Sequence, residues 1–280
     1  MRRVLASLPR RDWIFVLSVI VLVLVLGMAL SARLLFPGGP WEVVGPPVVP
    51  PFTKGFLLGT DTIGRSVLAG IFYGARVSLL VGIVATALPF LLGMLIGAIA
   101  GYSGGLVDDA LMRLTELFQT VPHFMLALVL VAILTPSITS IIIAISVVSW
   151  PPVARLVRAE FLSLRNREFV EAAVLAGRSH TSIVFKEILP NALGPVVVMA
   201  SLMVATAILL EAAISFIGLG DPNLMSWGYM VGASRTALRT AWWVSVVPGL
   251  AVFLTVLAIN FVGEALNEAL NPRSALRAYK

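Results

Sequence analysis

The feature that most constrains this chain is a long apolar run without any charged side chain. Residues 117–154 contain no Lys, Arg, Asp or Glu. A helix that crosses about 30 Å of hydrocarbon at about 1.5 Å per residue needs about 20 apolar residues. The run is therefore too long for one crossing. Thr135, Pro136 and Ser137 supply a turn near its middle, so we expect two spans joined there by a tight hairpin.

Four more apolar runs bring the expected number of spans to six. Hydrophobic residues make up 59% of the 280 residues and charged residues 12%, and the mean hydropathy is +1.00. This composition is typical of an integral membrane protein. We therefore expect an all-α, polytopic membrane helix bundle, whose first span is too long for a signal peptide and is not cleaved. The other four spans are expected near residues 13–36, 77–101, 193–217 and 241–263.

The distribution of basic residues predicts how the six spans are oriented. Six crossings place both termini on one side of the membrane, and cytoplasmic loops carry an excess of Lys and Arg. We therefore predict that both termini and the segment 155–190 are cytoplasmic. The basic residues on this side are Arg2, Arg3, Arg10, Arg11, Arg113, Arg155, Arg158, Arg165, Arg167, Arg178, Lys186, Arg273, Arg277 and Lys280. The opposite loops hold Lys54, Arg65, Arg235 and Arg239, with Arg33 and Arg76 at the membrane ends.

No separate soluble domain or internal repeat is visible in the sequence. We divide the chain into three parts. Residues 1–70 comprise an N-terminal tail, the first span and an external loop, FPGGPWEVVGPPVVPPF, whose prolines predict a stiff, non-helical conformation. Residues 71–270 form a five-helix core with a cytoplasmic insertion at residues 155–190. Residues 271–280 form a cytoplasmic tail.

Several functions are excluded by residue types that the chain lacks. Cysteine is absent, so there is no disulfide framework and no thiolate metal site. His123 and His180 are isolated and predict no metal site. The net charge of +6 comes from residues that flank apolar spans, which indicates membrane orientation and no nucleic-acid binding. Neither Lys54, Lys186 nor Lys280 follows a glycine as in the phosphate-binding loop G-x-x-x-x-G-K-[ST]. The chain is therefore not expected to hydrolyse ATP or to be an enzyme.

The first part of the insertion has the pattern of an amphipathic helix. Apolar residues recur near helical spacing among the charges of residues 155–169. Glu171, Ala172 and Ala173 continue this pattern with strong helix formers. Gly177 can adopt the left-handed conformation that ends a helix, so we expect the helix to stop there.

The second part of the insertion predicts another short helix. Ser179 or Thr181 can cap a helix over residues 182–189, and Pro190 is expected to end it because proline lacks a backbone N–H. The result is two short helices bent about a glycine and presented to the cytosol. Small alanines permit close approach of another backbone, so this shape indicates a docking segment.

The residues of the insertion resemble the EAA motif of ATP-binding-cassette importer permeases. The matching positions are Glu171, Ala172, Ala173, Gly177, Leu189 and Pro190. Three further stretches are similar to the peptide/nickel branch, of the dipeptide/oligopeptide permease C-type: LLGTDTIGRSVLAGIFYGARVSLLVG, AISFIGLGDPNLMSWGYM and NFVGEALNEALNPR. The resemblance covers nearly the whole chain. It departs from the family pattern at Ser66, usually acidic, at Glu187, usually isoleucine, and in a shorter loop after GLGD.

The resemblance implies a permease subunit of an ATP-driven, binding-protein-dependent importer in the bacterial or archaeal plasma (inner) membrane. It implies a homologous second permease that completes the pathway, two ATPase subunits that hold ATP and Mg, and an extracytoplasmic substrate-binding protein. This chain itself would need no cofactor. The insertion would be the coupling segment that enters a groove on the ATPase. The cargo of the branch includes peptides, glutathione and nickel chelates, which the sequence does not distinguish.

One alternative is an ATP-independent secondary transporter or channel. In that case Glu211, which lies inside the fifth expected span, would carry protons. A carboxylate at mid-membrane costs about 2.5–3.5 kcal/mol on insertion scales, so it must face protein or water. Glu211 is therefore expected either to line a pathway or to form a polar contact between helices.

A more remote alternative is an intramembrane serine protease. Gly101, Tyr102, Ser103 and Gly104 form G-x-S-G, which resembles the serine motif of rhomboid-type proteases. Such an enzyme needs a histidine base within hydrogen-bond reach of the serine. The two histidines fall at the start of the third span and in the insertion, so neither is expected on a late span at membrane depth.

Overall fold

The computed structural model describes residues 12–53 and 55–270 of the chain. The described residues form helices, with isolated β-bridges in place of any extended strand, which confirms the all-α expectation. The predicted tails, residues 1–11 and 271–280, and Lys54 lie outside the described residues, as do the basic side chains of the two tails.

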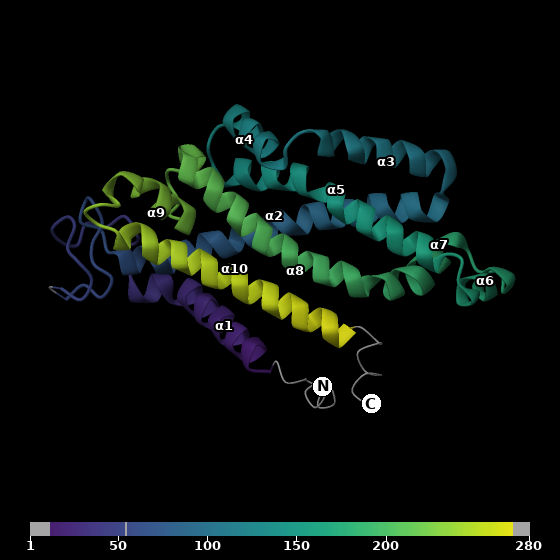
Figure 1. Cartoon of the computed structure of the whole chain (residues 1–280), viewed down its shortest axis with the longest axis horizontal. Helices are drawn as coiled ribbons and strands as arrows, with labels where there is room; N and C mark the ends of the chain where they lie inside the picture. The colour runs from purple at the N-terminus through teal and green to yellow at the C-terminus, as the bar shows by residue number, and fades with distance from the viewer. Residues whose placement is uncertain (1–11, 54, 271–280) are drawn as a thin grey trace.

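Five long helices lie side by side in one bundle (Figure 1). Each is long and apolar enough to cross a membrane, close to where an apolar run predicted a span. In the bundle α2 packs against α1, α5 and α8, and α10 packs against α1 and α8. These helices are α1 (Asp12–Leu35), α2 (Val67–Ser103), α5 (Ile138–Leu164), α8 (Leu189–Ile214) and α10 (Trp243–Leu270).

The expected third span is divided between two helices. The chain forms α3 (Gly105–Thr120) and α4 (His123–Leu134), which are bent by 80° at the break between them. Pro122 explains the break, because a proline disfavours helical geometry at the residue before it, and Val121 is extended at φ −89° and ψ 132°. The 12 residues of α4 are too few to cross a bilayer. The described residues thus contain five candidate spans, or six if the bent pair counts as one.

The hairpin predicted inside the apolar run is present between α4 and α5. Thr135 has φ +70°, and Ser137 caps α5 by accepting a hydrogen bond from the Ser140 N–H at 3.1 Å. The side chain of Asp221, which lies in the chain shortly after the end of α8, also accepts a hydrogen bond from the Ile138 N–H at 2.9 Å. Two side chains therefore satisfy backbone donors at the start of α5.

The helix α2 is longer than its apolar run predicted. It begins at Val67, where Ser66 is the N-cap and accepts from the Ala69 N–H at 3.3 Å. The prediction began the span after Arg76, but this side chain is exposed and leaves the helix intact. At about 1.5 Å per residue, the 37 residues of α2 extend about 55 Å, which is well beyond the hydrocarbon thickness of a bilayer.

Three glycines allow α2 and α5 to approach closely. A Cβ atom at Gly93 would lie 2.6 Å from Val153 Cβ, and one at Gly101 would lie 2.6 Å from Phe161 Cβ. A Cβ at Gly97, between them, would meet the backbone of α5. Small residues at this spacing are a common way for membrane helices to pack, so α2 and α5 behave as one tightly packed pair.

The two ends of the bundle carry different structures. At one end α6 (Glu168–Leu175) and α7 (His180–Ile183) extend beyond the long helices, and at the other end α9 (Trp227–Ala233) lies beside residues 36–53 and 55–66 (Figure 1). These residues form turns and no helix, as the prolines predicted. The helix α1 runs toward the α9 end and α10 runs away from it (Figure 1), so the helix ends nearest the two termini share a side. That this side is cytoplasmic stays a prediction.

Candidate functional site

The turn after α6 has the geometry that Gly177 predicted. Gly177 has φ +74°, the left-handed conformation that glycine adopts at little cost. Its N–H donates to Val174 O at 2.9 Å, and the Arg178 N–H donates to Ala173 O at 3.2 Å. This pair of bonds is the Schellman motif, so α6 ends in a defined bend.

The second short helix begins as predicted but does not end as predicted. The Ser179 hydroxyl accepts from the Ser182 N–H at 3.4 Å and caps α7. The chain then passes through a π-helical turn, η1 (Val184–Ile188), directly into α8. We expected Pro190 to end the helix, and this prediction is wrong because the helix continues through it. The wide turn, in which the Leu189 N–H donates to Val184 O five residues back, leaves room for a proline that would otherwise clash with the preceding turn.

The predicted docking residues divide between a buried and an exposed face. Ala173 is 7% exposed and packs in a cluster with Val170, Ile183 and Phe161. This alanine therefore contacts the chain's own core. Glu171, Ala172 and Pro190 are exposed and Leu189 is half-buried.

Large apolar side chains that the sequence analysis did not single out lie on the exposed face of the same segment. Leu175 is 88% exposed, Phe185 64% and Val174 53%. Large apolar side chains exposed at the end of a molecule are typical of a surface that another molecule covers. Helical spacing from the buried Val170 and Ala173 would have placed Leu175 on the opposite face.

An ion pair crosses the bend of the segment. The Arg178 guanidinium contacts the Glu187 carboxylate, so the turn after α6 is tied to η1. Glu187 stands where the family usually has isoleucine, and in this chain the acidic residue has a partner within the segment. The Asn191 amide adds a bond to the Glu187 backbone oxygen at 2.7 Å.

Glu211 is buried and makes a polar contact between α8 and α9. It is 1% exposed, and its Oε1 accepts hydrogen bonds from Ser215 at 2.7 Å and Ser226 at 2.6 Å. Ser226 is the N-cap of α9 and also accepts from the Tyr229 N–H at 3.0 Å. The carboxyl group therefore positions the start of α9 against the end of α8. Its second oxygen, Oε2, has no hydrogen-bond partner among the described residues.

The two histidines bond to groups other than Ser103. His180 Nδ1 and the Tyr102 hydroxyl are hydrogen-bonded at 2.6 Å. His123 Nε2 donates to Val148 O. The protease alternative requires a histidine directed at the serine, and this arrangement gives it no support.

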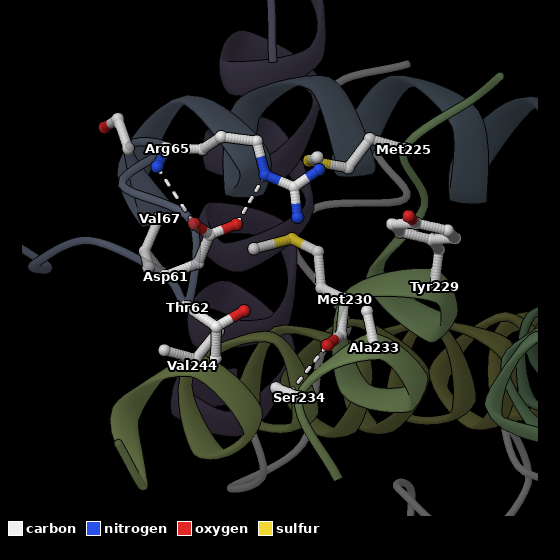
Figure 2. A pocket seen from close by; sticks show the side chains of 11 residues that line it. Asp61, Thr62, Arg65, Val67, Met225, Tyr229, Met230, Ala233, Ser234 and Val244 are labelled. Atoms are coloured by element: carbon white, nitrogen blue, oxygen red, sulfur yellow. Dashed lines mark hydrogen bonds and ion pairs between the residues drawn. The ribbon is translucent and has the colours of Figure 1, made fainter. Parts of the chain in front are cut away.

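A small pocket lies at the α9 end (Figure 2). Asp61 Oδ1 accepts from the Arg65 N–H at 2.9 Å, and its Oδ2 accepts from Arg65 Nε at 2.5 Å. Figure 2 shows the Arg65 side chain directed toward Met225 and Met230. The free volume, about 20 Å³, is near that required for one water molecule, so the pocket is too small to hold a peptide.

The fold and the segment together define the class of protein. It is a multi-pass helical membrane protein that presents a bent, partly apolar helical segment at one end. Residues 93–275 match the model of the family described as binding-protein-dependent transport system inner membrane component. The chain belongs to this family, and the resemblance to importer permeases of the peptide/nickel branch is confirmed.

Proteins similar to this chain include bacterial peptide permeases. The di/tripeptide transport system permease protein DppC of Pseudomonas aeruginosa (strain UCBPP-PA14) is 41% identical over 219 residues, which are 78% of this chain and 72% of the relative. The dipeptide transport system permease protein DppC of Alkalihalophilus pseudofirmus is 42% identical over 216 residues, 77% of this chain and 71% of the relative. The oligopeptide transport system permease protein OppC of Haemophilus influenzae is 39% identical over 225 residues, 80% of this chain and 72% of the relative.

A solved structure supports the fold. It is described as inward facing conformations of the MetNI methionine ABC transporter, and it aligns with 72% of this chain and 96% of its own chain at a TM-score of 0.61. At 19% sequence identity this likeness concerns the fold alone.

Proposed function

We propose that this chain is a permease subunit of an ATP-driven, binding-protein-dependent importer of dipeptides or oligopeptides. The observation that carries the proposal is the α6–α7 segment, whose inner face is anchored in the chain's own core while Leu175 and Phe185 are exposed at the end of the bundle. The identity of about 40% to peptide permeases supports the cargo class. Glutathione and nickel chelates are the competing cargoes.

The proposed mechanism assigns the chemistry to partner subunits. Two ATPase subunits hold ATP and Mg, and the exposed face of α6 and η1 docks in a groove on one of them. Closure of the ATPases on ATP favours one arrangement of the permease helices over the other, because ATP binds the closed dimer more tightly. A second, homologous permease completes the pathway, which then opens alternately to the two sides of the plasma (inner) membrane. An extracytoplasmic binding protein delivers the cargo at the α9 end.

Within this mechanism the docking residues have separate roles. Glu171 and Ala172 lie on the exposed face and contact the ATPase. Gly177 sets the bend, and Ala173 anchors the segment from behind. Leu189 and Pro190 join the segment to α8.

Glu211 is proposed to position α9 rather than to carry protons. Both of its observed bonds come from serine hydroxyls of the same chain, and this arrangement suits an interhelix contact. A proton-coupled flux in vesicles that contain this chain alone would favour the secondary transporter instead.

The docking role is tested by a charge placed on the exposed face of α6. Ala172→Asp should leave the chain inserted in the membrane but should abolish co-purification of the ATPase subunits, because a carboxylate is then desolvated against the partner. The matched control is Ala110→Asp, since Ala110 is an exposed alanine on α3. Full retention of the ATPases by Ala172→Asp would contradict the proposal. Uptake of a labelled dipeptide, competed by glutathione or a nickel chelate, identifies the cargo.

A further inference from the structure

Two polar contacts fasten the docking segment to the end of α2. Arg165, just before α6, donates from Nη1 to Gly101 O at 3.1 Å. His180, at the start of α7, is hydrogen-bonded through Nδ1 to the Tyr102 hydroxyl at 2.6 Å. These two contacts, here called the α2 clamp, attach to neighbouring residues of α2 from the two sides of α6.

The packing around the α2 clamp is close. The rings of Tyr102 and His180 meet edge to face, with centroids 5.8 Å apart. A Cβ atom at Gly104 would lie 2.9 Å from Arg165 Nη1, so the guanidinium rests against the last turn of α2. Tyr102 also packs on the buried cluster that contains Val170 and Ile183 of the segment. Both polar and apolar contacts therefore join the segment to the end of α2.

The α2 clamp restricts a movement of α6 that the turns on either side of this helix would otherwise permit. The segment joins α5 through a turn at residues 165–167 and bends again at Gly177. Two such turns would let α6 swing without moving the long helices. Arg165 at the end of α5 and His180 at the start of α7 attach the two flanks of α6 to α2, and the cluster that contains Val170, Ala173 and Tyr102 packs α6 itself against the same end of α2. A displacement of α6 must then displace the end of α2.

The helix α2 connects this place to the opposite end of the bundle. It is tightly packed on α5 through its glycines. Near its first residues, Trp227 of α9 donates from Nε1 to Ile71 O at 3.0 Å and from its backbone N–H to Ser78 Oγ at 3.3 Å. One helix thus contacts both the docking segment and α9, and it reaches α9 without passing through α8.

We propose that Tyr102 and Arg165 are positioning residues for coupling: the α2 clamp passes the motion of α6 into α2 and through it to the α9 end, in parallel with the covalent route through α8. This inference rests on the proposed function, because it assumes that the ATPases move α6. A contact that served stability alone would change the amount of folded complex and leave the uptake per ATP hydrolysed unaltered.

The test removes one hydroxyl from α2. Tyr102→Phe keeps the ring and its edge contact, and the matched control Tyr73→Phe removes the hydroxyl that donates to Phe36 O at 2.9 Å near the other end of the same helix. The complete transporter, with second permease, ATPases and binding protein, is reconstituted in vesicles. Uptake of a labelled dipeptide and ATP hydrolysis are measured together. Tyr102→Phe should lower the uptake per ATP by about two- to twelvefold, the factor that one ordinary hydrogen bond gives in an equilibrium, and Tyr73→Phe should leave it unchanged.

Variants of the partner residue sharpen the test. His180→Gln retains a hydrogen-bonding group and should keep most of the coupling, whereas His180→Leu should lose as much as Tyr102→Phe. The double variant Tyr102→Phe/His180→Leu should be no worse than either single variant, because all three lose the same contact. The inference is overturned if Tyr102→Phe has the same uptake per ATP as the unaltered protein, or if Tyr73→Phe loses as much as Tyr102→Phe. Either result leaves the proposed function standing. Failure of the unaltered chain to bind the ATPases refutes both.

Discussion

The close approach of α2 and α5 can be tested by adding one methyl group at Gly97. A Cβ atom there would meet Ala154 O and would lie 2.8 Å from Val157 Cβ and 3.0 Å from Arg158 N. Two of these three atoms belong to the backbone of α5, so the helices must separate to admit the methyl group. Overpacking of this kind costs about 1–3 kcal/mol, and alanine regains up to about 1 kcal/mol through its higher helix propensity.

We expect Gly97→Ala to lower the free energy of unfolding by about 1–2 kcal/mol. At roughly 2–4 °C per kcal/mol the Tm should fall by roughly 2–8 °C, measured by tryptophan fluorescence of the purified chain during heating. The matched control is Gly27→Ala in α1, where an added Cβ would have no atom within 4 Å, and its Tm should stay equal or rise. A Tm of Gly97→Ala that equals or exceeds that of the unaltered protein would refute the close packing of α2 on α5.

Three further substitutions test single polar contacts. Asp108→Asn removes the negative charge of a side chain, 9% exposed, that pairs with Arg158 of α5. This change should destabilise the chain by about 1–2 kcal/mol and speed hydrogen exchange in α3. The control Asp109→Asn, at the exposed neighbouring residue, should do neither. Glu211→Gln keeps an oxygen acceptor for both serine partners and should transport within about twofold of the unaltered protein, whereas loss of all transport would indicate a proton-carrying role. Asp221→Ala removes the acceptor of the first backbone N–H of α5 and should lower stability by about 1 kcal/mol in a denaturation assay.

The spans that were predicted well are those whose position in the sequence depends only on the length of an apolar run. Such a run must be helical to satisfy its backbone groups in a membrane, so α1 and α10 lie close to their predicted ranges. The third span was predicted less well, although Pro122 was visible. A proline is compatible both with a kinked span and with a broken one. The break is supported by contacts of residues far apart in sequence, such as Asp108 with Arg158 and His123 with Val148.

The segment of α6 and α7 likewise has features that the sequence predicts and features that it does not. The bend at Gly177 and the cap at Ser179 were predictable, because both depend on the backbone preferences of a few neighbouring residues. The continuation through Pro190 was not, since a π-helical turn before a proline has no clear sequence signal. The burial of Ala173 against Phe161 and the contact between Tyr102 and His180 join different helices, so no local pattern indicates them.

The sequence by itself determined that this chain is an all-α membrane protein of the importer permease family with a bent amphipathic insertion. It could do so because hydrophobic length, turn residues and motif spacing act along the chain. Only the tertiary structure decided which face of α6 is free, how closely α2 meets α5, and that Glu211 bonds the cap of α9. These features depend on which side chains meet when distant helices pack, and packing is a property of the whole bundle.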